Sequence, residues 1–236
     1  MDVKDEDQGG HRRATAPGRG AVFVPDPRIT LGYRAARIIF EGILRLWFRP
    51  KVIGRENVPA EGPVIIAPVH RSFADFGFAA FLTDRKLFFM AKDSLWEHRL
   101  LGRLLLSLGA FPVHRESADR EALRHAEEVL TRGETLVLFP EGARQEGAAV
   151  QDLLEGAAFL AARTGASIVP VGIGGSDLAM PKGRTIPKPL RITVVVGHAL
   201  PPPERSDRGR VSRSRVHATT ELLRQGIQDV YDAARN

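Results

Sequence analysis

The stretch Val64-Ile-Ile-Ala-Pro-Val-His-Arg-Ser-Phe-Ala-Asp75 joins an apolar run to a polar turn. Its first part, Val64 to Ala67, is short, continuous and apolar, which is typical of a strand buried on both faces of a sheet. The run leads to His70, and Asp75 follows after four intervening residues. A carboxylate beside an imidazole can fix the tautomer of the ring. The stretch therefore predicts a general base with a group that orients it.

Strand-like and helix-like segments alternate on both sides of this stretch. The sequence predicts strands at 51–54, 64–67, 86–91, 111–113, 135–139, 168–172 and 191–197, and helices at 74–84, 96–108, 118–131, 153–164 and 211–234. Such alternation favours an α/β fold with a central mixed or mostly parallel sheet flanked by helices. We expect three parts: a flexible N-terminal arm at 1–27, an amphipathic helix at 28–49 and one domain at 50–236.

The segment 28–49 has a narrow polar stripe and a broad apolar side. The stripe consists of Arg34, Arg37, Glu41 and Arg45, and the apolar side of Leu31, Ile38, Ile39, Ile43, Leu46 and Trp47. This pattern suits a helix that lies in a membrane interface. It equally suits a helix that packs its apolar side on the domain core and exposes its arginines. The sequence leaves these two alternatives open.

The charge balance points to an anionic partner. The 236 residues carry a net charge of +6, which suits nucleic acid, anionic lipid or a phosphorylated substrate. Aromatic residues make up 7% of the chain, and no nucleic-acid recognition motif is present. The absence of cysteine excludes disulfides and a cysteine nucleophile and is compatible with the cytosol. No apolar run reaches the roughly 18 residues of a spanning helix, and the charged N-terminus does not resemble a secretory signal.

Four segments place glycine, proline or charge where a predicted strand meets a turn. They are His70 to Asp75, Gly109 to Arg115, Leu138 to Arg144 and Ile168 to Gly175. In this order they resemble the motif blocks of the glycerolipid acyltransferases, the lysophosphatidic acid acyltransferase family, over about residues 28–200. The first matches the family's histidine–aspartate signature. The third, Phe139-Pro-Glu-Gly-Ala-Arg144, resembles its Phe-Pro-Glu-Gly-Thr-Arg block, with Ala143 in place of threonine and Gln145 where a serine often follows.

The resemblance implies transfer of a fatty acyl group from a thioester to the free hydroxyl of 1-acylglycerol 3-phosphate, forming phosphatidic acid. The thioester, on coenzyme A or acyl carrier protein, would be a co-substrate, and neither a cofactor nor a metal is expected. His70 would act as general base and Asp75 would orient it. The substrate hydroxyl is itself the nucleophile, so no enzyme serine or cysteine is required.

The remaining expected site residues serve the acceptor. Lys92, Arg115 and Arg144 follow strands and can hold a phosphate, the arginines by bidentate contacts. By resemblance, Glu141 and Gly142 belong to the acceptor site and Pro170 shapes the pocket wall. Glu141 either binds the acceptor hydroxyl or orients an arginine, and Gly142 lets backbone approach the ligand. The leucine-rich segment 96–108 lines an acyl groove, docks on lipid or belongs to the core. His114 has no interpretation.

The expected partners are a lysophospholipid, an acyl thioester and a membrane surface that residues 28–49 contact. The protein would lie on the cytoplasmic face of the cell membrane as a peripheral protein, and nucleic acid is not an expected partner. Other acceptors, such as glycerol 3-phosphate or a different lysolipid, remain alternatives. So do two further classes, a non-catalytic lipid-binding protein and a basic nucleic-acid-binding protein.

Overall fold

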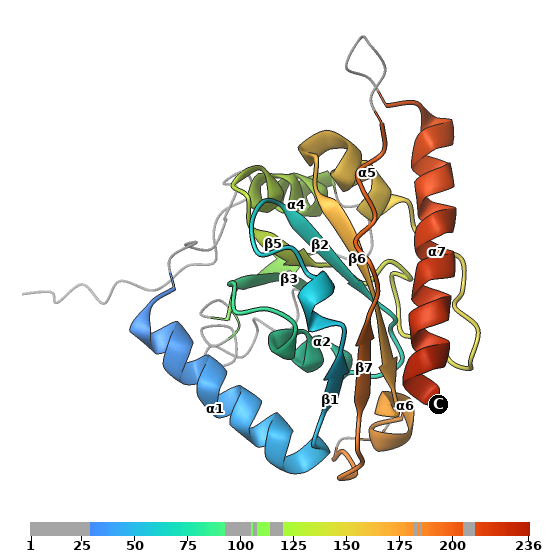
Figure 1. The fold of residues 1–236 in the computed structure, drawn as a ribbon. Coiled ribbons are helices and arrows are strands. Elements are labelled where there is room, and N and C mark those ends of the chain that lie inside the picture. The colour runs from blue at the N-terminus through green and yellow to red at the C-terminus, as the bar shows by residue number, and fades with distance from the viewer. Residues whose placement is uncertain are drawn as a thin grey trace, which may run out of the picture.

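A seven-stranded sheet forms the centre of the molecule (Figure 1). The computed structural model describes residues 29–92, 105, 108–113, 120–181, 184, 186–204 and 211–236. The strands are β1 (Lys51–Ile53), β2 (Val64–Pro68), β3 (Leu87–Lys92), β4 (Ala110–Val113), β5 (Thr135–Val137), β6 (Ser167–Gly174) and β7 (Thr193–Val196). The helices are α1 (Leu31–Phe48), α2 (Asp75–Phe78), α4 (Arg120–Thr131), α5 (Gly156–Thr164), α6 (Ser176–Ala179) and α7 (Arg213–Arg235), with 3₁₀ turns η1 (Arg55–Asn57) and η2 (Ala79–Phe81). The predicted arm at 1–27 and most of the predicted helix at 96–108 lie outside the described residues.

The strand order is β1-β7-β6-β2-β5-β3-β4. All neighbours run parallel except β6 and β7, which are antiparallel. The predicted α/β fold with a mostly parallel sheet is therefore confirmed. Strand β2 lies near the middle, between β5 and β6. Each of its residues is buried, as expected for a strand covered by helices on both faces.

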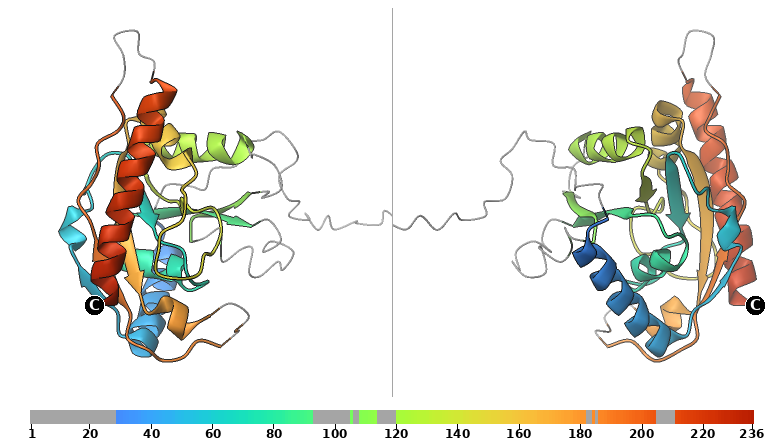
Figure 2. Two further views of the ribbon diagram at one scale, coloured as in Figure 1. Left: turned by 90° about the vertical axis from the view of Figure 1, so that its right-hand side faces the viewer. Right: turned by 60° about the vertical axis from the view of Figure 1, so that its left-hand side comes forward.

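Helices cover both faces of this sheet. On one face α7 packs against β6 and β7, α5 packs beside α7, and α4 packs beside α5. Helix α1 lies on the other side, near α2, and the views from different directions agree on this arrangement (Figures 1 and 2). The buried face of α7 carries Val216, Thr220, Leu223, Ile227, Tyr231 and Ala234, at helical spacing. Burial of this stripe holds α7 in place.

Two glycines let α7 come close to β6. A Cβ on Gly172 would lie 2.2 Å from the carbonyl oxygen of Val230, and one on Gly174 would lie 2.1 Å from that of Ala234. Only glycine permits such close approach of two backbones. Helix packing thus explains the glycines at positions 172 and 174.

Helix α1 turns its apolar side away from the domain. Tyr33, Leu44 and Phe48 are buried against the domain. Phe40 stacks on Phe76, and Trp47 donates to the carbonyl of Pro187 at 3.2 Å. Arg37 also faces inward and donates to the carbonyl oxygens of Arg85 and Ala80 at 2.9 and 2.6 Å. The alternative in which α1 buries its apolar side and exposes all its arginines is therefore wrong. No helix in the described ranges is both long and apolar enough to cross a membrane.

Two helices are shorter than the sequence predicts. The predicted helix at 74–84 is observed as α2 and η2, since Gly77 lowers helix propensity and Leu82 bonds back only to Ala79, over three residues. The predicted helix at 153–164 begins only at Gly156. Its first residues follow another path because the Leu154 N–H donates to the carbonyl of Pro140 at 2.9 Å. This contact ties the entry of α5 to the turn after β5.

Candidate functional site

The predicted site segments meet at one edge of the sheet. Strands β2, β5, β3 and β4 are adjacent and parallel, so their carboxyl ends lie side by side. His70 follows the end of β2, Glu141 follows β5, and Lys92 is the last residue of β3. With strands about 4.8 Å apart, the end of β3 lies about 10 Å from that of β2. Ligands of open α/β sheets bind at this kind of edge.

His70 and Asp75 form the contact that their spacing predicts. The imidazole Nδ1 lies 3.3 Å from Asp75 Oδ2. The same oxygen accepts hydrogen bonds from the backbone N–H groups of Arg71 at 2.6 Å and Ser72 at 2.7 Å. The Asp75 side chain is fully buried. These donors hold it in one position, and a ring that donates from Nδ1 leaves the lone pair of Nε2 free to accept a proton.

The His70 ring is also held from the side of β5. Its centroid lies 4.1 Å from that of Phe139, with the rings tilted by 30°. The His70 side chain retains 13% exposure, so solvent and small groups reach it. One edge of the ring thus contacts a buried carboxylate, and one face contacts an aromatic ring. This arrangement can deliver a proton acceptor in a fixed direction.

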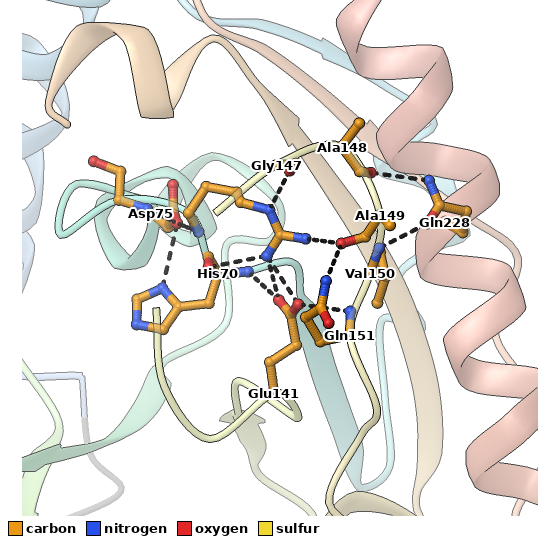
Figure 3. Close-up of polar contacts among 11 residues, drawn as sticks. His70, Asp75, Glu141, Gly147, Ala148, Ala149, Val150, Gln151 and Gln228 are labelled. Atoms are coloured by element: carbon orange, nitrogen blue, oxygen red, sulfur yellow. Dashed lines mark hydrogen bonds and ion pairs between the residues drawn. The ribbon is translucent and has the colours of Figure 1, made fainter. Parts of the chain in front are cut away.

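Glu141 is buried beneath this pair rather than open to a ligand (Figure 3). Its carboxylate oxygens accept from Arg71 Nη1 at 2.8 and 2.7 Å. Oε2 also accepts from the His70 N–H at 2.9 Å, and Oε1 from the Gln151 N–H at 3.2 Å. Of the two roles left open for Glu141, the geometry fits the orientation of an arginine. That arginine is Arg71, and the carboxylate is not placed to contact an acceptor hydroxyl.

Sequence reasoning overlooked Arg71, although it lies inside the stretch that carries His70 and Asp75. A usable signal was present. An arginine that follows a fully apolar strand must find an acidic partner if it is buried, and Glu141 is the acidic residue of the neighbouring segment. What the sequence did not show was that the arginine points inward. Its side chain is only 1% exposed.

Gly142 and Pro170 each have a structural role besides the one that the resemblance implies. Gly142 has φ of +69°, and a Cβ there would lie 2.7 Å from Leu154 Cδ1. The residue therefore permits the turn after β5, and its expected place in the acceptor site stays a prediction. Pro170 lies within β6, where its ring faces Gly226 of α7 and Gly197 after β7. Its contacts help to hold α7 on the sheet, and its expected role in the pocket wall stays a prediction.

The basic residues of the expected phosphate clamp are placed only in part. Arg144 is exposed, just before Gln145, whose N–H donates to the His70 carbonyl at 2.9 Å. It is therefore close to His70 along a hydrogen-bonded backbone. Lys92 ends β3, but its side chain lies outside the description. Arg115 and His114 follow β4 and also lie outside the described residues.

Tyr231 of α7 packs against the buried Arg71 guanidinium. Its ring lies 5.1 Å from the guanidinium carbon of Arg71 and 5.4 Å from that of Arg235. Burial raises the pKa of the Tyr231 phenol, nearby Asp177 raises it further, and the arginines oppose the shift. The phenol is therefore neutral at physiological pH. A neutral π face suits contact with a cation.

Comparison with known proteins identifies the class. The acyltransferase family model matches residues 49–174, more than half of the chain, which includes β1 to β6. The chain belongs to the acyltransferase family. A solved structure from Thermotoga maritima, the 1-acyl-sn-glycerophosphate acyltransferase PlsC, shares the fold. It has a TM-score of 0.67, 23% identity, and coverage of 84% of this chain and 79% of that one.

Relatives of known name are 1-acyl-sn-glycerol-3-phosphate acyltransferases. The protein from Bacillus subtilis is 28% identical over 192 residues, which are 80% of this chain and 91% of the relative. The protein from Chlamydomonas reinhardtii is 29% identical over 165 residues, 68% of this chain and 49% of the relative. That from Streptococcus pneumoniae is 35% identical over 117 residues, 49% of this chain and 42% of the relative. The chain thus matches nearly all of the Bacillus relative but only about half of the other two.

Proposed function

We propose that this protein transfers a fatty acyl group from a thioester to the free hydroxyl of 1-acylglycerol 3-phosphate, forming phosphatidic acid. The carrying observation is the His70–Asp75 contact of 3.3 Å at the carboxyl edge of the sheet. The names of the relatives support the choice of acceptor. The donor is an acyl thioester on coenzyme A or acyl carrier protein, and we propose no cofactor beyond this co-substrate.

In the proposed mechanism, Nε2 of His70 removes the proton from the acceptor hydroxyl as its oxygen attacks the thioester carbonyl. Asp75 stabilises the imidazolium that forms and keeps the ring in the required orientation. The C–S bond then breaks, an ester remains, and the thiolate takes the proton from His70. Atoms and charges balance without a covalent enzyme intermediate. The substrate hydroxyl replaces the enzyme nucleophile of a serine hydrolase.

The acceptor phosphate requires fixed cations, and we assign this role to Lys92, Arg115 and Arg144. Strand order supports the assignment for Lys92, which ends β3, and for Arg144, which follows β5, both at the edge that carries His70. Arg115 is included on the sequence resemblance alone. Charge-assisted hydrogen bonds from such residues are the strong contacts for phosphate. Phosphate binding here would place the glycerol hydroxyl toward β2 and His70.

We further propose that α1 lies on a membrane surface. Its outward side exposes Leu31, Ile38, Ile39, Ile43 and Leu46, by 59% to 84%. A row of large apolar side chains on one helix face is more than the scattered exposed residues of an ordinary surface. The protein would thus act as a peripheral protein at the membrane that holds its lipid acceptor. The cytoplasmic face stays a prediction from the sequence.

One assay tests the reaction. The release of free thiol from palmitoyl-coenzyme A is followed with lysophosphatidic acid, with glycerol 3-phosphate, with lysophosphatidylcholine and without acceptor. We expect release that depends on lysophosphatidic acid, with a phosphatidic acid product. Release with glycerol 3-phosphate alone would reassign the acceptor. Absence of release with every acceptor, using either coenzyme A or acyl carrier protein as carrier, would contradict the proposed activity.

A further inference from the structure

Arg71 is a buried charge that the proposed mechanism does not use. Its side chain is 1% exposed, beside the 13% exposed His70. Removing a guanidinium from water is unfavourable unless several partners compensate for its lost hydration. The identity of those partners indicates what the residue does.

The partners of Arg71 come from separate parts of the chain. Nη1 donates to Glu141 and to the carbonyl of His70, at 3.1 Å for the latter. Nε donates to the carbonyl of Gly147 at 3.1 Å, and Nη2 donates to that of Ala149 at 3.0 Å (Figure 3). The planar group also lies over the Tyr231 ring. One side chain therefore joins the loop after β2, the long loop after β5 and helix α7.

As a consequence, hydrogen bonds hold both the backbone N–H and the backbone carbonyl of His70. Its N–H donates to Glu141 at 2.9 Å, and its carbonyl accepts from Arg71 and from the Gln145 N–H. Asp75 and Phe139 fix the imidazole ring, and Asp75 also accepts from the Arg71 N–H, which shares a peptide unit with the His70 carbonyl. Arg71 and Glu141 add a further constraint, because they hold the His70 carbonyl and the His70 N–H from the other side. The two constraints together determine where Nε2 points.

The loop that accepts from Arg71 is in turn attached to α7. Gln228 accepts from the Val150 N–H at 2.8 Å and donates to the Ala148 carbonyl at 3.2 Å. The segment 147–150 is thus fixed on one side by Arg71 and on the other by Gln228. It provides a rigid support for the guanidinium. A rigid support is what a side chain needs if it is to position another group.

We propose that Arg71 is a positioning residue for acyl transfer, which acts by locking the His70 peptide through Glu141 and the His70 carbonyl. This inference rests on the proposed function and names a residue that acts on its base without touching substrate. It also excludes Arg71 from the phosphate clamp, because its side chain is buried and engaged with protein acceptors. A displacement of about 1 Å in a catalytic group can lower turnover by roughly a hundredfold.

The main test is Arg71→Lys. Lysine keeps the charge, but its single nitrogen cannot reach Glu141 and the carbonyls of Gly147 and Ala149 together. We expect kcat to fall by about a hundredfold while KM for lysophosphatidic acid changes by less than about threefold. Arg224→Lys is the matched control, since Arg224 pairs with Glu221 on the surface of α7, and its kinetics should equal those of the parent. A kcat within about threefold of the parent, or a loss confined to KM, would overturn the proposal.

A double variant separates positioning from stability. Arg71→Met alone leaves the buried Glu141 carboxylate without its cation and risks unfolding. Arg71→Met with Glu141→Leu replaces the pair by apolar side chains, a change that folded proteins often tolerate. We expect this variant to fold, to melt below the parent because the backbone groups of His70, Gly147, Ala149 and Gln151 lose partners, and to remain about as slow as Arg71→Lys. Recovery of kcat together with stability would show a purely structural role and overturn the proposal.

A spectroscopic measurement keeps the proposal testable if the proposed reaction fails. Nitrogen-15 spectra of labelled histidine report the tautomer and order of each imidazole, and His70→Ala assigns the His70 signals. The parent should show a single His70 environment with the proton on Nδ1. Arg71→Lys should shift or broaden those signals, whereas Arg224→Lys should not. An unchanged His70 spectrum in Arg71→Lys would overturn the positioning role whatever the acceptor proves to be.

Discussion

The loop around His70 and the outer side of α1 have opposite relations to solvent. Around His70, two charged side chains are removed from water, with 1% exposure for Arg71 and 0% for Glu141. On α1, Leu31 and Leu46 are each 84% exposed. Each region thus reverses the usual rule that charges lie outside and large apolar groups lie inside.

The buried charges and the exposed apolar side chains differ in where their partners lie. The buried pair is satisfied within the chain, because its hydrogen-bond partners belong to the same domain. The exposed apolar row is not satisfied by the described part of the chain and requires a partner outside it. An internally paired site indicates precise geometry, as catalysis needs. An exposed apolar face indicates binding, and under the proposed function the expected partner is a membrane.

Among changes in the loop around His70, the largest loss of activity is expected for His70→Ala. We expect kcat to fall by about 10²- to 10⁴-fold, since this is the usual contribution of a general base. The measurement is thiol release from palmitoyl-coenzyme A in the presence of lysophosphatidic acid. The variant should remain folded, because Asp75 keeps its hydrogen bonds from the N–H groups of Arg71 and Ser72. Turnover within about tenfold of the parent would remove His70 from the role of base.

Membrane binding by the exposed apolar side of α1 is tested by Ile39→Glu combined with Leu46→Glu. If each side chain buries in lipid, its loss weakens binding by about 1.5–3 kcal/mol, or at least about tenfold. Co-sedimentation with phosphatidylglycerol-containing vesicles measures the effect, and stability should persist because both residues are already exposed. Leu222→Glu on α7, 62% exposed on the opposite side of the sheet, is the control. Equal sedimentation of the double variant and the parent would contradict membrane binding by α1.

A third substitution concerns Arg144, the exposed residue next to Gln145 in the loop that contacts His70. Arg144→Ala should raise KM for lysophosphatidic acid by about tenfold, the effect of losing one charge-assisted hydrogen bond. Because Arg144 is exposed, stability should stay unchanged. Monoacylglycerol, which lacks the phosphate, serves as the control acceptor and should show no change in KM. An unaltered KM for lysophosphatidic acid would exclude Arg144 from the phosphate clamp.

The smallest expected effect concerns Glu134, a partly buried carboxylate that contrasts with the fully paired Glu141. Burial raises the pKa of Glu134 above its ordinary value of 4.5, although Arg85, Lys86 and Arg132 oppose the shift. The folded state therefore binds the proton more tightly than the unfolded state does. This group's contribution to stability is favourable at low pH and is lost as pH rises through the raised pKa.

Glu134→Gln should remove that dependence. The melting temperature of the variant relative to the parent should rise as pH is raised from 4 through the raised pKa, and then level off. Thermal unfolding at a series of pH values gives the difference curve. A difference that does not vary with pH, or one that falls as pH rises, would contradict the assigned direction of the shift.

Much of the fold could be predicted from local pattern. The apolar run Val64 to Ala67 became β2, and the stripe with Leu223, Ile227 and Tyr231 became the buried face of α7. Helix ends were harder, since the entry of α5 depends on a hydrogen bond between Leu154 and Pro140, distant along the chain. The length of a helix is decided by such tertiary contacts as well as by propensity.

The site could be predicted where the contacting residues are close together in the sequence. His70 and Asp75 are separated by a single turn, so their spacing alone brought the carboxylate to the ring. Glu141 lies 71 residues from His70, and its carboxylate could have served a ligand or an arginine equally well. The resemblance assigns Gly142 and Pro170 to the ligand site, and the structure adds that they lie against Leu154 and α7, respectively.

By itself the sequence determined the sheet class, the histidine–aspartate pair and the two faces of α1, because each follows from residue spacing along one element. Only the tertiary structure decided that α1 turns its apolar face outward and that Arg71 turns inward to Glu141. In both cases the direction in which side chains point depends on the elements that the rest of the chain places on either side. Spacing along the sequence therefore does not reveal that Arg71 is buried beside the proposed base, although Arg71 directly follows His70.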